Sequence, residues 1–327
     1  IKMCSRLNDL KEFDKYFMII YPPIMVVMSI ANNTVILILM TSKLRNGTSR
    51  QDHITIYYWA LSIGDALSSF FQMFPKWVKN AFGVDMYSSS EVSCRILPRF
   101  ISYTISDFCI WLVVVMTFDM FIRVYFPVQF RIYVNFKRVY FILISLLFLA
   151  LGKDFCYIFE NTLIKNNCAF NNNTFVSYYF TSGNSFLISM VFVSILPVGI
   201  VFILNIFIFV KWKKLFPKIH NTNKSHSTEN SQRNIIKVFL SVSISFSVFI
   251  IPNFFVLPFT NFAFPDECIK LIYTVFSHVT ASIFYLNHIT KLYFYILFSK
   301  SYRDELLKIS RNFGFKYYKN EVSPQSN

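Results

Sequence analysis

Glycine is scarce in this chain, and the motifs that mark many nucleotide-binding and metal-dependent enzymes are missing. Seven glycines occur in 327 residues, which leaves few positions for the glycine-rich loops that cradle phosphates. The sequence contains no HExxH, P-loop or GxGxxG pattern. The charged residues inside its apolar runs do not form an acid, a base and a nucleophile. We therefore expect a protein that is not an enzyme, with no cofactor and no metal site.

Acidic residues are also few. The chain has 17 Asp and Glu against 32 Lys and Arg, a formal net charge of +15. Such a charge is typical of nucleic-acid binders, but a hydrophobic content of 54% argues against that class. Anionic lipid headgroups account for the basic residues instead. We expect membrane lipids, and no nucleic acid, as partners of these residues.

Long apolar runs are the main feature that is present. A transmembrane helix needs about 20 apolar residues to cross the roughly 30 Å hydrocarbon core. Seven runs meet this length: Tyr16–Ser42, Ile54–Phe74, Phe100–Ile122, Val139–Phe159, Phe175–Val210, Val238–Thr260 and Leu271–Phe298. The predicted fold class is an all-α membrane protein, a bundle of seven transmembrane helices.

The chain divides into three parts around this bundle. Residues 1–15 form an N-terminal segment, residues 16–299 the bundle, and residues 300–327 a cytoplasmic part. Apolar residues recur at helical spacing at the start of this last part, at Tyr302, Leu306, Ile309 and Phe313. This spacing predicts a short amphipathic helix on the membrane surface.

The basic residues between the runs are concentrated on one side of the membrane. If the N-terminus is outside, the cytoplasmic segments hold 20 Lys and Arg against 5 Asp and Glu, a net +15, and the outer segments are close to balance. The positive-inside rule then predicts an outer N-terminus and a cytoplasmic C-terminus. We expect a multi-pass protein of the plasma membrane. Inside the runs, we consider the charges of Asp65, Asp107, Asp119 and Lys291.

Several motifs stand in the order and spacing of one receptor family. They are Asn32-Asn33 in the first run, Leu61-Ser62-Ile63-Gly64-Asp65 in the second, Cys94 before the third, Cys168 before the fifth, Pro197 in the fifth, and Phe246 six residues before Pro252 in the sixth. Over about residues 17 to 313 the chain resembles the rhodopsin-like (class A) G-protein-coupled receptors. Its general character is similar to that of invertebrate FMRFamide-like neuropeptide receptors.

This resemblance implies a disulfide between Cys94 and Cys168, which would tie the outer end of the third helix to the second outer loop. Some peptide receptors of the family carry a second bridge, and here we expect it between Cys4 and Cys268. Asn172 begins a sequon in the second outer loop, so we expect it to be glycosylated.

The chain departs from the family at the residues of the activation mechanism. The family's Asp-Arg-Tyr reads Asp119-Met120-Phe121, so its arginine is absent. Arg123 lies one turn further on and is a candidate substitute, or an anchor to lipid phosphates. Asp119 either pairs with Arg123 at i, i+4 or is a solvated carboxylate at a helix end. In the seventh run, only Tyr295 remains of Asn-Pro-x-x-Tyr.

An unpaired charge deep in a bilayer is costly, so Asp65 and Lys291 are expected to find partners. In the family these two positions face each other around a sodium site. We predict a direct salt bridge in which the Lys291 ammonium takes the sodium's place, in a pocket lined by Asn287 and Cys109. The alternative is that Lys291 snorkels toward the inner surface.

The resemblance also implies a ligand cavity that opens outward between the helices. Ser102 stands where amine receptors carry their aspartate, which argues against a biogenic amine. Asp107 either holds a cationic ligand group or bonds to a neighbouring helix. The candidate ligand-binding residues are Arg99, Ser102, Tyr103, Asp107, Asn253, His278 and Tyr285; for each single Tyr or His, interfacial packing is the alternative.

Three functions compete. The first is a receptor for an extracellular ligand, a short peptide, that signals through a heterotrimeric G protein. The second is a chemosensory or orphan receptor with altered or absent G-protein coupling, which the missing arginine favours. The third is a transporter, against which the lack of an internal repeat argues.

Overall fold

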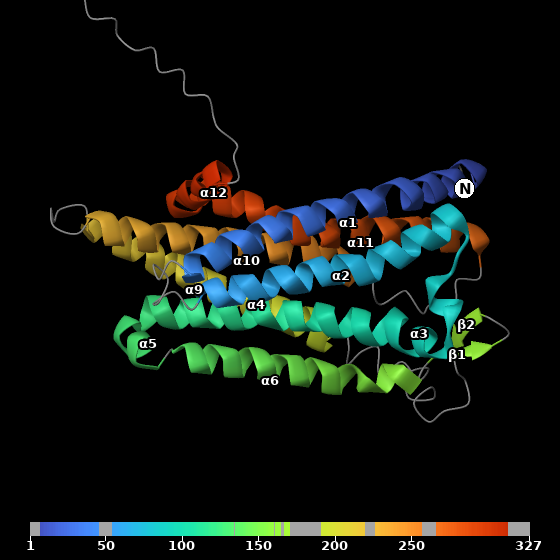
Figure 1. The fold of residues 1–327 in the computed structure, drawn as a ribbon, viewed down its shortest axis with the longest axis horizontal. Helices are drawn as coiled ribbons and strands as arrows, with labels where there is room; N and C mark the ends of the chain where they lie inside the picture. The colour runs from blue at the N-terminus through green and yellow to red at the C-terminus, as the bar shows by residue number, and fades with distance from the viewer. Residues whose placement is uncertain are drawn as a thin grey trace, which may run out of the picture.

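Seven long helices lie alongside one another in this computed structural model (Figure 1), which describes residues 7–45, 54–133, 135–159, 161–164, 167–170, 191–219, 226–256 and 266–312. The long helices are α1 (Leu7–Arg45), α2 (Ile54–Phe82), α4 (Ser102–Tyr125), α6 (Phe136–Asp154), α9 (Leu196–Ile219), α10 (His226–Val256) and α11 (Glu267–Phe298). Shorter elements join or extend them: η2 (Met86–Ser89), α3 (Glu91–Arg95), η3 (Ile96–Ile101), α5 (Pro127–Tyr133), η4 (Phe155–Phe159), β1 (Asn161–Ile164), β2 (Asn167–Phe170), η5 (Val191–Ile195) and α12 (Lys300–Asn312). The predicted all-α membrane bundle is confirmed.

Length and composition explain why these helices suit a membrane. Within the described ranges, six stretches are long and apolar enough to cross: Leu7–Arg45, Glu91–Tyr125, Phe136–Phe159, Val191–Lys214, Asn234–Pro252 and Glu267–Phe298. The remaining long helix, α2, has 29 residues, and its inward face carries Asp65, Ser68, Ser69 and Gln72. These polar residues build the site described below.

The bundle has two distinguishable ends. We call the end that carries β1 and β2 the hairpin end, and the opposite end, where α12 lies, the α12 end (Figure 1). The N-terminal end of α1 lies at the hairpin end. Helix α1 begins at Leu7, nine residues before the predicted span, so residues 7–15 of the predicted N-terminal segment are helical and belong to α1.

The hairpin is fixed to the neighbouring helices on both sides. Leu163 of β1 lies opposite Cys168 of β2, and Cys168 forms the predicted disulfide with Cys94 of α3, with Cα atoms 5.4 Å apart. The Leu163 N–H donates to Glu91 Oε2 at 2.8 Å, and the Cys168 N–H donates to Ser88 Oγ at 3.1 Å. On the outer edge of each strand, one backbone N–H group therefore already has a hydrogen-bond partner.

At the α12 end, the short helix α12 packs across α1 and α11. The Lys43 ammonium lies 3.4 Å from the centroid of the Tyr302 ring, and that ring lies 5.3 Å from the ring of Tyr295. Arg303 donates to the carbonyl oxygen of Ile296 at 2.8 Å. Tyr302 is buried and Leu307 is exposed, so α12 has two unlike faces, as the spacing of its apolar residues predicts.

Candidate functional site

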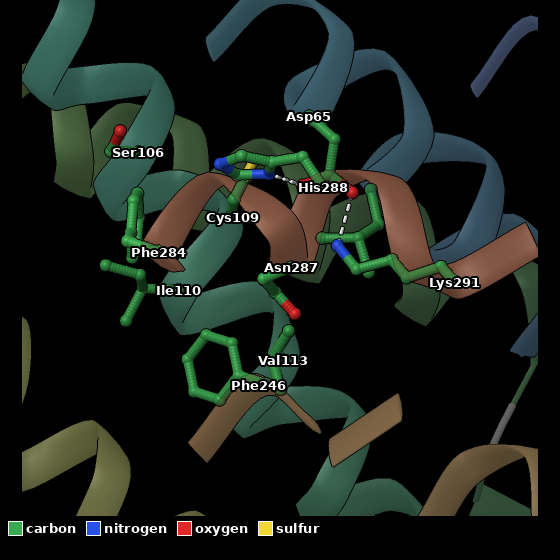
Figure 2. A pocket seen from close by; sticks show the side chains of 11 residues that line it. Asp65, Ser106, Cys109, Ile110, Val113, Phe246, Phe284, Asn287, His288 and Lys291 are labelled. Carbon is green, nitrogen blue, oxygen red and sulfur yellow. Dashed lines mark hydrogen bonds and ion pairs between the residues drawn. The ribbon is translucent and has the colours of Figure 1, made fainter. Parts of the chain in front are cut away.

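Asp65 lies at the centre of a buried polar cluster between α2 and α11 (Figure 2). The Lys291 ammonium forms an ion pair and hydrogen bond with Asp65 Oδ2. His288 Nδ1 lies 2.7 Å from the other carboxylate oxygen, Oδ1. The three side chains are 0%, 1% and 2% exposed, respectively. Each oxygen of the carboxylate therefore has its own partner.

Helix geometry accounts for this arrangement. His288 and Lys291 are three residues apart on α11, so both lie on the face turned toward α2. Helix α1 supports the same turn of α11: Asn33 Nδ2 donates to the carbonyl oxygen of His288 at 2.9 Å, and Asn32 Nδ2 donates to that of Ile289 at 3.1 Å. The cluster is thus held from two sides.

The structure brings together the pair that the sequence predicts, Asp65 and Lys291. The snorkelling alternative does not occur here, because the Lys291 side chain is buried against Asp65. The charges of the Asp65 carboxylate and the Lys291 ammonium cancel, which limits the cost of burying them. What the sequence analysis missed is His288, although its spacing of three residues from Lys291 was a usable signal.

A cavity of about 10 Å³ adjoins this cluster, lined by residues that include the predicted Asn287 and Cys109. That volume is about what one water molecule needs. His288 Nε2 and Asn287 Oδ1 are buried and have no hydrogen-bond partner within the described part of the chain. The close approach of α2 and α4 here depends on Gly64, because a Cβ atom at that position would overlap Cys109 Sγ.

A second polar layer lies closer to the hairpin end and is centred on Gln72. Its amide nitrogen donates to Ser68 Oγ at 3.0 Å and to the carbonyl oxygen of Ser102 at 3.0 Å, and it also bonds to Ser106. Its amide oxygen accepts from the hydroxyl of Tyr285. Gln72 thereby links α2, α4 and α11, and it was not among the residues that the sequence predicts.

Two predicted ligand-binding hydroxyls are used inside the protein. Ser102 is buried, and its Oγ donates to the carbonyl oxygen of Leu97 at 2.9 Å. The cause is the π-helical turn η3 just before it, which changes the partners of backbone carbonyls. Tyr285 is 4% exposed and bonds to Gln72. In this structure neither hydroxyl is available to a ligand without breaking these contacts.

The other predicted ligand residues lie apart. Tyr103 is 42% exposed and packs edge-on against Tyr157, with ring centroids 5.2 Å apart. His278 Nδ1 lies 2.7 Å from Asp14 Oδ1 of α1. Arg99 is half-buried on η3, and the side chain of Asn253 falls outside the described residues. The structure therefore does not gather these positions around a shared space, and their ligand role remains a prediction.

Asp107 is held by the neighbouring helix, in line with the second of its two predicted roles. The Lys153 ammonium of α6 forms an ion pair with Asp107 and lies 2.7 Å from Asp154 Oδ1. Asp107 is 3% exposed and Asp154 is fully buried. The sequence analysis left Lys153 and Asp154 out of the charges within the spans, because they stand at the end of the fourth run.

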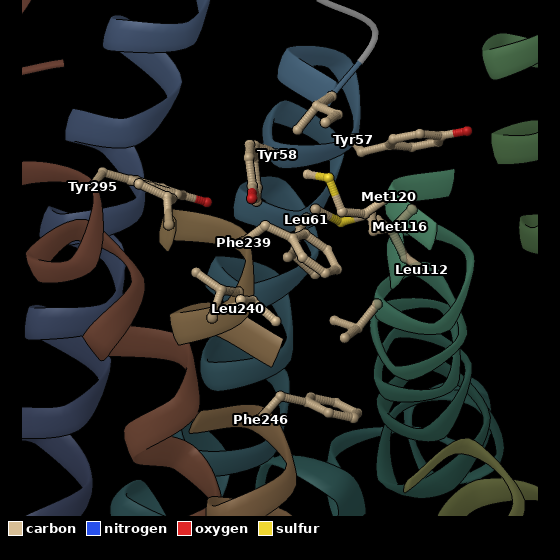
Figure 3. Close-up of a cluster of buried hydrophobic side chains, with 14 of the residues drawn as sticks. Tyr57, Tyr58, Leu61, Leu112, Met116, Met120, Phe239, Leu240, Phe246 and Tyr295 are labelled. Carbon is tan, nitrogen blue, oxygen red and sulfur yellow. The ribbon is translucent and has the colours of Figure 1, made fainter. Parts of the chain in front are cut away.

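At the α12 end, Met120 takes the place where the resembled family has arginine. Met120 is fully buried in an apolar cluster with Leu112, Met116 and Phe239 (Figure 3). Tyr295, also fully buried, packs edge-on against Tyr58 with ring centroids 4.9 Å apart. Apolar contacts therefore join α2, α4, α10 and α11 in this region.

The Arg123 charge acts on Asp119, four residues earlier on α4, although no direct ion pair between the two is found within the described part of the chain. The Arg123 guanidinium carbon lies 4.8 Å from the centroid of the Phe130 ring, in a cation–π contact. Asp119 is 9% exposed, and its Oδ2 has no hydrogen-bond partner among the described residues. The alternative of a solvated carboxylate is not observed either, because the bundle covers Asp119.

Two predictions on the loops fall outside the described residues, namely glycosylation at Asn172 and the participation of Cys4 in a second disulfide. Cys268, the predicted partner of Cys4, is disulfide-bonded. The bridge between these two cysteines stays a prediction.

A family model matches most of the chain. Residues 31–290 match the model of the 7 transmembrane receptor (rhodopsin family). The match covers more than half of the chain. It includes Asp65, His288 and both cysteines of the confirmed disulfide. No individual curated protein matches the chain.

Proposed function

The chain belongs to the rhodopsin family of seven-transmembrane receptors, and from that premise we propose that it binds a short extracellular peptide and signals through a heterotrimeric G protein. Membership of the family makes it a multi-pass membrane receptor and not an enzyme. The proposal adds the class of ligand, the orientation of the chain and the coupling to a G protein.

The observation that carries the peptide proposal is the fixed hairpin. A disulfide and two hydrogen bonds, donated by the backbone N–H groups of the hairpin to Glu91 and Ser88, hold β1 and β2 against α3 and η2. A wall fixed in this way is ordered before a ligand arrives, which reduces the entropy cost of binding a flexible peptide. Because its edge donors at Leu163 and Cys168 are already bonded, we expect side-chain recognition and not strand addition.

The charges near the hairpin suit a ligand that carries both polar backbone and charged ends. Lys79 pairs with Asp85 at 2.7 Å, and Arg95 pairs with Glu91 at 2.6 Å. Both pairs are partly exposed, so they exchange partners at small cost. Burial, together with the neighbouring Asp85 carboxylate, raises the pKa of Tyr87 to about 12. Its hydroxyl therefore keeps its proton at physiological pH and remains a hydrogen-bond donor.

We propose that the hairpin end faces outside and the α12 end faces the cytoplasm. The positive-inside distribution of Lys and Arg supports this orientation. The disulfide supports it as well, because such bonds persist in oxidising compartments. Cytoplasmic coupling would then involve the α12 end, where Arg123 lies over Phe130.

One observation favours a second candidate, a chemosensory or orphan receptor whose coupling to G proteins is altered or lost. Met120 is 0% exposed and packs among apolar side chains. A thioether offers no charge with which to contact a G protein, so the usual contact of the family is missing. Under the first candidate, in contrast, we propose that Arg123, three residues further along α4, takes over that contact.

A second-messenger assay separates the two candidates. Cells that express the chain are challenged with a library of short amidated peptides, and cAMP and calcium are recorded for the parent, for Met120→Arg and for Arg123→Ala. We expect a ligand-dependent response in the parent that Arg123→Ala abolishes at equal surface expression. A response in Met120→Arg alone would establish the pocket but contradict coupling in the parent. Silence in both would contradict the peptide proposal.

A further inference from the structure

A cluster of unbalanced charge lies between α4 and α6, outside the polar layers described so far. It contains two carboxyl groups, from Asp107 and Asp154, and a single ammonium, from Lys153. Helices α4 and α6 run side by side over their length (Figure 1). Asp154 is the last residue of α6, so the cluster lies toward the hairpin end of this interface.

The two carboxyl groups share one partner. Both contact the same nitrogen atom, Lys153 Nζ, so their nearest oxygens lie within about 6 Å of each other, since each is within about 3 Å of that nitrogen. Asp107 is 3% exposed and Asp154 is 0% exposed. If both were ionised, the cluster would hold a net charge of −1 away from water, which is strongly unfavourable.

A further polar group, the Thr104 hydroxyl, borders the cluster. Thr104 is buried, and its hydroxyl lies within hydrogen-bonding range of Asp154, while no other described residue is bonded to it. A hydroxyl of this kind can accept a hydrogen bond from a protonated carboxyl group as well as donate to an ionised one. It therefore suits either protonation state of Asp154.

The surrounding elements supply no second cation among the described contacts of Asp107. The charges that act on Asp107 are those of Lys153 and Asp154. Within four residues of Asp107 and Asp154 along the chain, the other titratable side chains are Tyr103 and Cys109 of α4 and Cys156 and Tyr157 of η4. The neighbouring η3 adds the cation Arg99, whose charge is not among those that act on Asp107 or Asp154. Tyr103 and Tyr157 pack ring against ring, and neutral groups of this kind do not offset a net negative charge.

We propose that Asp107, Asp154 and Lys153 form a proton-binding site, in which the two carboxyl groups together hold one proton at neutral pH. The proton comes from solvent and leaves one carboxylate to pair with the Lys153 ammonium, so the cluster becomes neutral. The Lys153 side chain is 34% exposed, which gives the site a route to its surroundings. Raising the pH removes the proton and weakens the docking of α6 on α4. This proposal does not depend on the ligand or on the coupling of the receptor.

Infrared difference spectroscopy on the purified full chain tests the proposal directly. A protonated carboxylic acid has a C=O stretching band that an ionised carboxylate lacks. We expect the parent to show such a band at neutral pH, and we expect both Asp107→Asn and Asp154→Asn to lose it, because either substitution makes the cluster neutral without a proton. Lys153→Arg, which keeps the positive charge, should retain the band.

Thermal unfolding over a range of pH provides the second readout, and it separates proton binding from a purely structural role. The parent is expected to lose stability as the pH rises, with loss of the infrared band over the same range, and Asp107→Asn is expected to lack this dependence. A band that neither aspartate substitution removes would overturn the proposal. If a substituted chain fails to fold, the measurements on the parent alone decide. A parent that lacks the acid band at neutral pH would overturn the proposal, and so would a parent whose acid band persists while its stability falls with rising pH.

Discussion

Two buried ionic clusters lie in the same bundle, and they differ in the balance of their charges. Around Asp65, one ammonium and one imidazole each contact a different oxygen of a single carboxylate. Around Lys153, two carboxyl groups contact one ammonium. The first cluster is closed on all sides, whereas the lysine of the second is partly exposed.

The difference teaches what each cluster requires from its surroundings. A carboxylate whose two oxygens both have partners needs no further ion, and removing a partner leaves a buried charge uncompensated. Two carboxyl groups that share one cation must take up a proton or remain charged. We therefore expect the cluster of Asp65 to act as a fixed link between α2 and α11, and that of Lys153 to respond to solvent.

Lys291→Ala is expected to have the largest effect. It leaves Asp65 buried with only His288 beside it, and breaking such a pair costs about 3–5 kcal/mol of unfolding free energy. The measurement is the unfolding of the purified protein in detergent. Because we propose that the ammonium takes the place of a sodium ion, sodium should recover part of the loss in the variant and should not affect the parent. Choline, which is much larger, is the control ion. An equal response of both proteins to sodium would contradict this proposal.

His288→Leu is expected to cost less, about 1–3 kcal/mol, because it leaves one oxygen of Asp65 without its hydrogen bond but keeps the ion pair. The same unfolding experiment measures it. The double variant of His288→Leu and Asp65→Asn is the control. If the bond to Asp65 causes the loss, the effect of His288→Leu should shrink in the Asp65→Asn background; an unchanged loss would assign it to packing.

Lys153→Met should cost about 1–2 kcal/mol at neutral pH, less than the change at Lys291, because Lys153 is partly exposed and its two partners can each take up a proton. The loss should become smaller when unfolding is measured at acidic pH. A loss that does not change with pH would mean that Lys153 contributes mainly through the packing of its apolar stem.

Asp119→Asn is expected to have the smallest effect, within about 1 kcal/mol of the parent, because Asp119 Oδ2 has no hydrogen-bond partner among the described residues and the cost of burying the carboxylate offsets the attraction of the Arg123 charge. Asp65→Asn is the matched control, the same substitution at a carboxylate with two partners, and should be clearly destabilising. Similar effects of the two substitutions would remove the distinction between a carboxylate whose two oxygens are both bonded and one with an unbonded oxygen.

The parts of the fold that the sequence predicts are those that a single physical requirement determines. A bilayer demands long apolar runs, which identify α1, α6 and α11 directly. The cost of a buried charge demands a partner for Asp65, and the resemblance to a receptor family supplies Lys291 on the facing helix.

The parts that the sequence does not predict depend on tertiary contacts between short polar groups. Nothing in the spacing of Gln72 shows that it contacts three helices. Lys153 and Asp154 stand side by side at the end of an apolar run, where solvated residues are common, so only the packing of α6 on α4 shows that both lie close to Asp107. The π-helical turn η3, whose Leu97 carbonyl oxygen accepts a hydrogen bond from the Ser102 hydroxyl, also leaves no clear pattern in the sequence.

That turn has a consequence for reading related sequences. A π-helical turn holds one residue more than an α-helical turn, so η3 (Ile96–Ile101) acts as a built-in insertion between α3, which carries Cys94, and α4. Each residue of an α-helix advances about 100° around the axis, so deleting one residue within η3 would restore a regular helix there and keep both the disulfide and the inward face of α4. The same deletion further along α4 would rotate Asp107 or Met120 away from its neighbours. Length variation among relatives of this chain is therefore expected to fall within η3.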